Sequence, residues 1–170
     1  DDLAVDVIKH LMESVDEIEP KQVDDVIVGC ANPEGEQGLQ IGRLISARSL
    51  GKEVAGITIN RYCASGLEAI ALAVGKIKAG FGEIFIAGGT ESMSMIPMTG
   101  YKLAPSYKAN TENINYHISM GHTAEAVAEK FNISREDADK FSYESHKKAG
   151  EAIDSGAVSY THLRAHETRT

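Results

Sequence analysis

The chain has 170 residues, of which 42% are hydrophobic and 25% are charged, as in an ordinary soluble globular protein. This length allows one domain with a real core, or one domain and part of another. The formal net charge of −8 argues against a nucleic-acid or anionic-membrane surface, because both need a basic footprint. The apolar runs are too short to span a bilayer, and two cysteines are too few for a disulfide framework, so we expect reduced thiols in a cytoplasmic protein.

Both ends of the chain depart from the pattern between them. The sequence begins without methionine, directly against an apolar-periodic helix, as if residues upstream of Asp1 had been cut away. Residues 159–170 (SYTHLRAHETRT) have no helical or strand period and resemble a translated sequencing adapter. A flexible basic tail is the alternative. We expect residues 159–170 to be non-native and to lie outside the fold.

Over residues 1–92, segments with apolar residues at helical spacing alternate with short continuous apolar runs, and this alternation predicts a parallel sheet. Apolar residues at helical spacing begin at Leu3, with Asp2 as the expected N-cap, and the run from Val26 to Cys30 is typical of a strand buried on both faces. The expected elements are helices over residues 3–15, 41–48 and 67–80 and strands over residues 26–30, 54–60 and 83–87. This order indicates βαβ units, and therefore an α/β fold with right-handed crossovers.

The character of the sequence changes at about residue 93. Residues 93–120 mix Met, Pro, Tyr and Asn without a clear period, which predicts an irregular excursion. Two helices follow, one around residues 124–131 and one that begins at Ser134, with Asp137 three residues later in an arrangement like a capping box. We therefore expect a partial α/β domain over residues 1–92 and a partial loop domain over residues 93–158.

Cys63 is the strongest candidate for chemistry. It lies in residues 60–66 (NRYCASG), directly after a predicted buried strand and directly before a predicted helix. At such a turn the backbone N–H groups and the helix dipole stabilise a thiolate, and the same donors can stabilise an oxyanion. A buried structural cysteine is the commoner fate of a lone Cys, but the small residues that follow leave room for an acyl group. Cys30 ends an apolar strand with no helix start after it, which favours an inert buried thiol.

Several segments closely resemble those of the thiolase family. They are residues 33–38 (PEGEQG), 60–66 (NRYCASG), 87–94 (AGGTESMS), 120–125 (MGHTAE) and the helix over residues 134–149. The resemblance runs in order from about residue 1 to about residue 158. The loop at 33–38, and Met120 preceded by Ser119 where biosynthetic members have histidine, are more similar to the degradative 3-ketoacyl-CoA thiolases.

The resemblance implies a thiolase-like layered fold, with a parallel-rich sheet and helices on both faces. It also implies ping-pong acyl transfer between coenzyme A thioesters, with no resident cofactor or metal. Cys63 would attack the thioester or 3-keto group, hold the acyl chain, and pass it to coenzyme A or to a second acyl-CoA. Its N–H would contribute to an oxyanion hole, Met120 would line the acyl or pantetheine pocket, and Glu91 would hold the nucleophile loop. A core methionine at a helix start is an equal alternative for Met120.

The resemblance also implies parts that this sequence does not contain. The family's first strand would precede Asp1, and its activating histidine and acid/base cysteine would lie downstream, so we expect the fragment to be inactive alone. His117 and His122 lie beside Met120, but a solvated or structural role is favoured for both. The complete protein is expected to be a homodimer with residues 54–60 near the two-fold axis. A 3-ketoacyl synthase-like condensing enzyme and a non-catalytic acyl-CoA binding protein remain alternatives.

Overall fold

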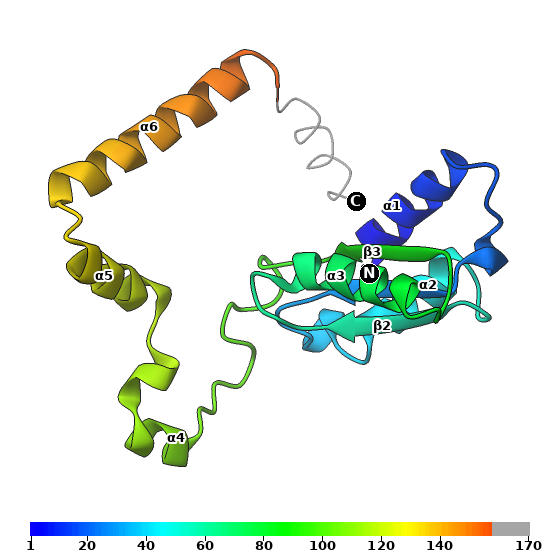
Figure 1. Ribbon diagram of the computed structural model, residues 1–170, viewed down its shortest axis with the longest axis horizontal. Coiled ribbons are helices and arrows are strands. Elements are labelled where there is room, and N and C mark those ends of the chain that lie inside the picture. The colour runs from blue at the N-terminus through cyan, green and yellow to red at the C-terminus, as the bar shows by residue number, and fades with distance from the viewer. Residues whose placement is uncertain (158–170) are drawn as a thin grey trace. The chain divides into compact units, whose positions relative to one another are not determined.

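The computed structural model describes residues 1–157 and divides into two compact units, Asp1–Ala104 and Pro105–Thr170 (Figure 1). The sequence placed a change of domain at residue 93, whereas the contacts divide the chain after Ala104. Residues 93–104 contact the loop after the first strand, where the backbone N–H of Tyr101 donates to Glu34 Oε2 over 2.8 Å. The predicted adapter-like tail at 159–170 lies outside the described residues and stays a prediction.

The first unit contains a three-stranded parallel sheet in the order β2-β1-β3. The strands are β1 (Asp25–Gly29), β2 (Ala55–Ile59) and β3 (Phe85–Gly89). Because β1 is central, it pairs in register with both neighbours, so that Gly29 lies opposite Ile59 on one side and Gly89 on the other. All five residues of β1 are buried, as its continuous apolar run predicted. The predicted parallel sheet of βαβ units is confirmed.

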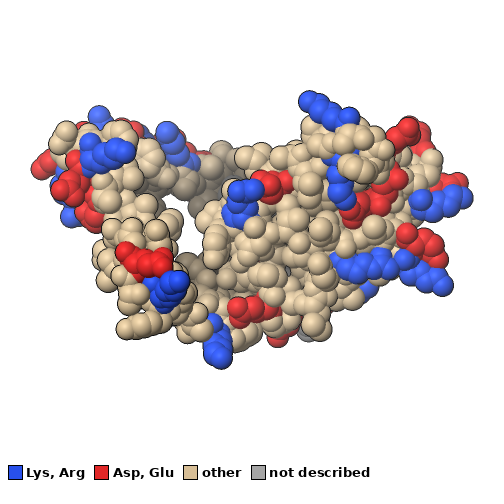
Figure 2. All heavy atoms as spheres, turned by 60° about the horizontal axis from the view of Figure 1, so that its bottom comes forward, with Lys and Arg blue, Asp and Glu red and all other residues tan. Residues whose placement is uncertain are grey.

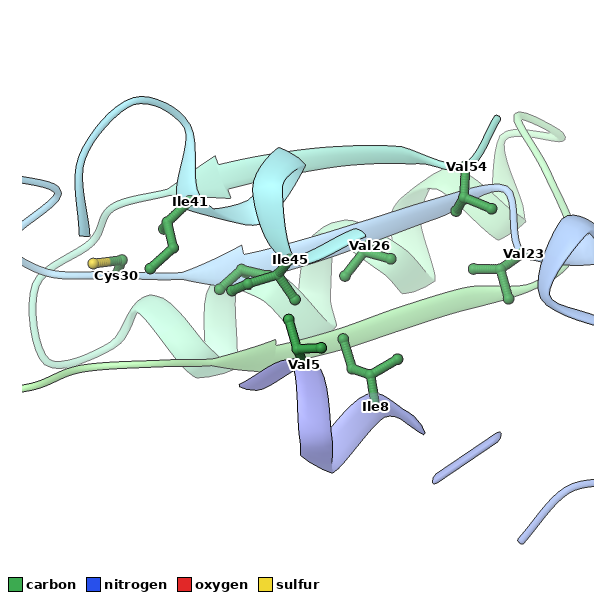
Figure 3. Close-up of a cluster of buried hydrophobic side chains, with 9 residues drawn as sticks. Val5, Ile8, Val23, Val26, Cys30, Ile41, Ile45 and Val54 are labelled. Carbon is green, nitrogen blue, oxygen red and sulfur yellow. The ribbon is translucent and has the colours of Figure 1, made fainter. Parts of the chain in front are cut away.

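Helices cover both faces of this sheet, which confirms the predicted layered α/β class. On one face, α1 (Asp2–Glu13) and α2 (Ile41–Ser49) pack on the strands. Figure 3 shows Val5 and Ile8 of α1 gathered with Ile45 of α2 around Val26 of the central strand. On the other face, α3 (Ser65–Lys78) packs its small residues Ala69 and Ala73 against Ile27, Ile57 and Phe85. Burial of these apolar side chains on both faces stabilises the central strand.

Several details of the first unit differ from the sequence prediction. Asp2 lies inside α1, and the N-cap is Asp1, which makes no side-chain cap hydrogen bond. The third strand is displaced toward Gly88 and Gly89, which belong to β3 itself. The apolar stripe that predicted α3 is exposed in this chain, because small residues on the opposite side of the helix make the close contact with the sheet. The exposed stripe comprises Leu67, Ile70, Val74 and Ile77.

The second unit is helical in its described part. It comprises α4 (Tyr107–Glu112), a 3-10 turn η3 (Ile114–His117), α5 (Met120–Phe131) and α6 (Arg135–Asp154). The short α4 and η3 lie in the stretch that the sequence predicted to be irregular, where polar Ser106 and Asn113 cap each element. The predicted cap of α6 is confirmed, since Ser134 Oγ accepts from the Asp137 N–H over 3.0 Å.

On the face in Figure 2, Lys and Arg side chains lie among Asp and Glu side chains, and this face carries no continuous basic patch. Within residues 1–157, none of the helices combines the length and the apolar character that crossing a bilayer requires.

Candidate active site

A pocket of about 460 Å³ opens where the carboxyl ends of the three parallel strands meet. This edge is where open α/β sheets bind ligands. The pocket is lined by strand ends, by the start of α3, and by the loop after β3; its residues are Gly29, Ala31, Asn32, Tyr62, Cys63, Ser65, Gly66, Gly89, Thr90, Glu91, Met93 and Met98. The predicted nucleophile Cys63 is thus exposed in a pocket, which Gly89 at the end of β3 also lines.

A strained turn presents Cys63. Tyr62 has a φ of +47°, the left-handed region that side-chain-bearing residues seldom adopt. The buried Ser65 closes this turn, because its Oγ donates to the Tyr62 carbonyl over 2.6 Å and accepts from the Arg61 N–H over 2.8 Å. The N–H of Tyr62 donates to Asn60 Oδ1 over 2.8 Å. Four polar contacts around one turn therefore fix the backbone at Cys63, including a hydrogen bond from the Ser65 N–H to the Tyr62 carbonyl.

Two backbone donors at this turn are free to bind a ligand. The N–H groups of Cys63 and Gly66 donate to no protein acceptor within residues 1–157. Both residues line the pocket. Gly66 lies in the first turn of the 14-residue α3 and Cys63 directly precedes its N-cap, Ala64, so the helix dipole adds partial positive charge beside both. Such donors stabilise a thiolate or the oxyanion of a tetrahedral intermediate.

The floor of the pocket depends on a close backbone approach. A Cβ at Gly29 would lie 2.6 Å from the Ser65 carbonyl carbon and 2.9 Å from the Gly66 nitrogen. Only a glycine therefore lets the end of β1 come this near the start of α3. The sequence showed a glycine at the strand end, but the contact it permits joins elements far apart in the chain.

Glu91 and Gln37 form a polar cluster at the pocket wall. Gln37 is only 4% exposed and is the last residue of a short 3-10 helix, η2 (Gly35–Gln37). Its Nε2 donates to Glu91 Oε1 over 2.6 Å and to the Asn32 carbonyl over 2.9 Å, while its Oε1 accepts from the Ser92 N–H. Glu91 also accepts from the Ala31 N–H over 2.6 Å. The resemblance assigned Glu91 to the nucleophile loop, but its direct contacts are with the loop after β1.

Cys30 is the buried thiol that the sequence predicted. It is 1% exposed and lies outside the pocket lining. Burial raises the pKa of the Cys30 thiol, and the nearby carboxylate of Glu91 raises it further. The protonated form is therefore favoured, so Cys30 is a poor nucleophile compared with an exposed cysteine.

The second predicted site residue, Met120, belongs to the second unit. It is the first residue of α5 and is 74% exposed, so it is not a core methionine in this chain. It lines a pocket of about 680 Å³ between α5 and α6, together with Val127 and Phe141. His117 and His122 are exposed, and each ring is hydrogen-bonded to a neighbouring polar side chain, Asn110 and Ser119 respectively. The ligand role of Met120 stays a prediction.

Sequence reasoning missed the polar residues that support the site. The sequence predicted Asn60 as the last residue of the second strand and Gln37 as a loop residue, with a role for neither, yet Asn60 ties two strand ends together and Gln37 is buried. Asn60 directly follows β2, and a polar residue at the carboxyl end of a parallel strand was the one available signal. Residues 1–157 contain no group of three His, Cys, Asp or Glu side chains arranged to hold a metal ion.

Comparisons with known proteins agree on one family. The family model for "Thiolase, N-terminal domain" matches residues 1–160. The chain is 45% identical to a 3-ketoacyl-CoA thiolase of Bacillus subtilis, over 92% of this chain and 40% of that protein. It is 38% identical to a 3-oxoadipyl-CoA/3-oxo-5,6-dehydrosuberyl-CoA thiolase of Escherichia coli, over 93% of this chain and 44% of that protein.

A solved structure shares the fold. The crystal structure of the Bacillus anthracis acetyl-CoA acetyltransferase matches with a TM-score of 0.66 and 33% identity, over 88% of this chain and 41% of that one. The chain spans about two fifths of the length of the relatives that it matches.

Proposed function

The chain belongs to the thiolase family, and from this premise we propose that the complete protein transfers acyl groups between coenzyme A thioesters through an acyl group carried on Cys63. The observation that carries the proposal is the exposed Cys63 at the start of α3, in a pocket with two free backbone N–H donors. A nucleophile beside unpaired donors is the arrangement that acyl transfer needs.

In the proposed thiolysis the Cys63 thiolate attacks the 3-keto carbon of a 3-ketoacyl-CoA, and negative charge develops on the keto oxygen. The N–H groups of Cys63 and Gly66 are the candidate donors to that oxygen. The bond between C2 and C3 then breaks, and acetyl-CoA leaves as an enolate that takes up a proton. The shortened acyl group remains as a thioester on Cys63 until a coenzyme A thiolate attacks it and releases Cys63. This scheme uses no resident cofactor or metal.

The direct test is to trap the acyl enzyme. The complete protein is mixed with acetoacetyl-CoA and digested, and the modified cysteine is located by mass spectrometry. We expect the acetyl adduct on Cys63 and none on Cys30, whose thiol is buried. Cys63→Ala should abolish both adduct and turnover, while Cys30→Ala should keep the adduct on Cys63. An adduct on Cys30 with Cys63 unmodified would contradict the proposal.

The proposed substrates are 3-ketoacyl-CoA thioesters, with cleavage in fatty-acid β-oxidation as the direction. Two observations support this choice. The relatives from Bacillus subtilis and Escherichia coli are named as thiolases of 3-ketoacyl-CoA and 3-oxoadipyl-CoA compounds, and Ser119 stands before Met120. Met120, at the mouth of the apolar α5–α6 pocket, is the candidate contact for the acyl or pantetheine chain. Rates with acetoacetyl-CoA and with longer 3-ketoacyl-CoA thioesters test the direction and the chain length. A preference for acetoacetyl-CoA synthesis over cleavage would oppose it.

We further propose a cytoplasmic homodimer in which β2 lies near the two-fold axis. Within the described residues β2 is an edge of the sheet, with one side of its backbone unpaired, and isologous pairing of such an edge would join two sheets. Sedimentation of the complete protein tests this. A monomer at all concentrations would contradict it.

A further inference from the structure

Hydrogen bonds connect the loops that follow all three strands, and they start at Gln37. Its side-chain amide is fixed in one orientation, because Nε2 donates to two oxygens while Oε1 accepts from the N–H of Ser92. Reversal of the amide would place NH₂ against that N–H. The buried Gln37 therefore fixes where the Glu91 carboxylate lies, since Nε2 is 2.6 Å from Oε1 of Glu91.

The Glu91 carboxylate in turn holds the loop after β1. It accepts from the backbone N–H of Ala31 over 2.6 Å and of Asn32 over 3.3 Å. These bonds to a carboxylate are charge-assisted, so they hold the peptide more firmly than neutral ones would. A glutamine at position 91 has one acceptor oxygen instead of two, and its NH₂ would face a backbone donor or Gln37.

The same peptide connects to the nucleophile. The carbonyl of Ala31 accepts from Asn60 Nδ2 over 2.9 Å, and Asn60 Oδ1 accepts from the N–H of Tyr62 over 2.8 Å. Tyr62 is the residue in the strained left-handed conformation, and Cys63 follows it directly. Ala31 is therefore held by Glu91 on its N–H and by Asn60 on its carbonyl, and Asn60 holds the turn.

We propose that Gln37, Glu91 and Asn60 are positioning residues for the nucleophile: they hold the left-handed turn at Tyr62 so that Cys63 and its free N–H donors keep their geometry in the pocket. None of the three needs to touch the reacting atoms to do so. A strained turn persists only where its surroundings over-determine it, and this network supplies that restraint. The inference rests on the proposed function, because it takes Cys63 as the nucleophile.

The test compares Glu91→Gln with Glu36→Gln in the complete protein. Glu36 is a matched control, because it lies exposed in the same region and its carboxylate accepts one hydrogen bond among the described residues, from the Tyr101 hydroxyl over 3.4 Å. We expect Glu91→Gln to slow acylation by acetoacetyl-CoA in a single turnover by about 10- to 100-fold, with little change in KM. Glu36→Gln should keep the wild-type rate. A wild-type acylation rate in a folded Glu91→Gln protein would overturn the proposal.

A double-mutant cycle separates positioning from a general loss of structure. Asn60→Asp keeps the acceptor for Tyr62 but removes the donor to Ala31, so it cuts the same connection at another point. If both residues act through one path, the double variant should acylate about as slowly as the slower single variant. If the two single variants instead lowered the acylation rate by factors that multiply in the double variant, the residues would act independently and the proposal would be overturned.

Alkylation of Cys63 by iodoacetamide keeps the two proposals apart, because it needs no thioester chemistry. We expect Cys63, located by mass spectrometry, to react several-fold more slowly in Glu91→Gln than in wild type or Glu36→Gln, since the loosened turn no longer holds the sulfur beside the start of α3. Absence of acylation in wild type, with this difference in alkylation intact, would reject the proposed function and keep the positioning role. Equal alkylation rates in all three proteins would reject the positioning role.

Discussion

The two units of the chain are stabilised in opposite ways. Every buried hydrophobic residue among residues 1–157 lies in the first unit, and its helices α1, α2 and α3 begin without a side-chain cap. The described part of the second unit has no buried residue, yet α4, η3, α5 and α6 are each capped by a side chain. The caps are Ser106, Asn113, Ser119 and Ser134. Burial thus sets the first unit, and local hydrogen bonds set the second.

This difference decides where the chemistry can be placed. The Cys63 turn lies against the buried sheet, where strand ends far apart in the chain fix one another. Met120 lies at a helix start that one serine caps, on a surface whose apolar side chains are exposed. A precise geometry for bond formation fits the first setting, because a packed core resists displacement.

The largest effect expected is the loss of a core side chain in the first unit. Ile27 is fully buried in the central strand, against Ala69 and Ala73. Ile27→Ala should lower the free energy of unfolding by about 2–5 kcal/mol, because it removes apolar contacts and leaves a cavity. Val127→Ala in α5, where the side chain is 43% exposed, should change it by less than about 0.5 kcal/mol. Hydrogen exchange of the β1 and α5 amides measures each effect. Equal losses of stability in the two variants would show that the two units do not differ in their dependence on burial.

A smaller loss is expected from a methyl group at the strand end. Gly29→Ala would push β1 from the start of α3 and should cost about 1–3 kcal/mol. Because the displaced residues carry Cys63, the acylation rate should fall as well. Gly88→Ala is the control, since a Cβ there meets nothing within 4 Å. Thermal unfolding of the two variants compares them, and equal melting temperatures would show that the backbone approach is not tight.

Loss of a helix N-cap should lower the stability of the capped helix by about 1 kcal/mol, and the loss should be confined to the second unit. Ser134→Ala removes the acceptor of the Asp137 N–H at the start of α6. Ser142→Ala is the control, because that hydroxyl only bonds the Ala138 carbonyl within the same helix. Helix-specific hydrogen exchange should rise at the first turn of α6 in the first variant and stay unchanged in the second. Unchanged exchange in Ser134→Ala would mean that the cap does not hold the helix.

Sequence reasoning succeeded where a signal is local or continuous. The apolar run in β1 predicted a strand buried on both faces, and Ser134 with Asp137 predicted the start of α6. The motifs around Cys63 predicted the thiolase family, which the family match confirms. It also predicted that Cys30 is buried, because no helix start follows it, while the nucleophilic role of Cys63 stays a prediction.

It failed where a residue depends on distant partners. Asp2 looked like a cap, but it lies inside α1, where its carboxylate forms an ion pair with Arg48 of α2, 46 residues away. The side of α3 that packs on the sheet carries alanines, because a close helix–sheet contact needs small residues, while the larger apolar residues that marked the helix are exposed. The burial of Gln37 has no local signal in the sequence, since it depends on Glu91, which lies 54 residues away.

The smallest effect is expected from a polar contact in the first unit. It tests whether anything besides burial stabilises that unit. Asp24 Oδ2 accepts from the N–H groups of Glu83 over 2.7 Å and Ile84 over 3.0 Å, just before β3. The Ile84 N–H, followed by that of Glu83, lowers the pKa of the Asp24 carboxyl below its usual value. A carboxyl whose folded-state pKa is depressed stabilises the fold above its ordinary pKa of about 4, and this contribution is lost as the pH falls through the lower folded-state value. Intrinsic-rate-corrected hydrogen exchange of the Glu83 and Ile84 amides should therefore increase as the pH is lowered below about 4, and Asp24→Asn should abolish this added dependence. If wild type and Asp24→Asn showed the same pH dependence, the Asp24 hydrogen bonds would not contribute to stability. Burial alone would then account for the stability of the first unit.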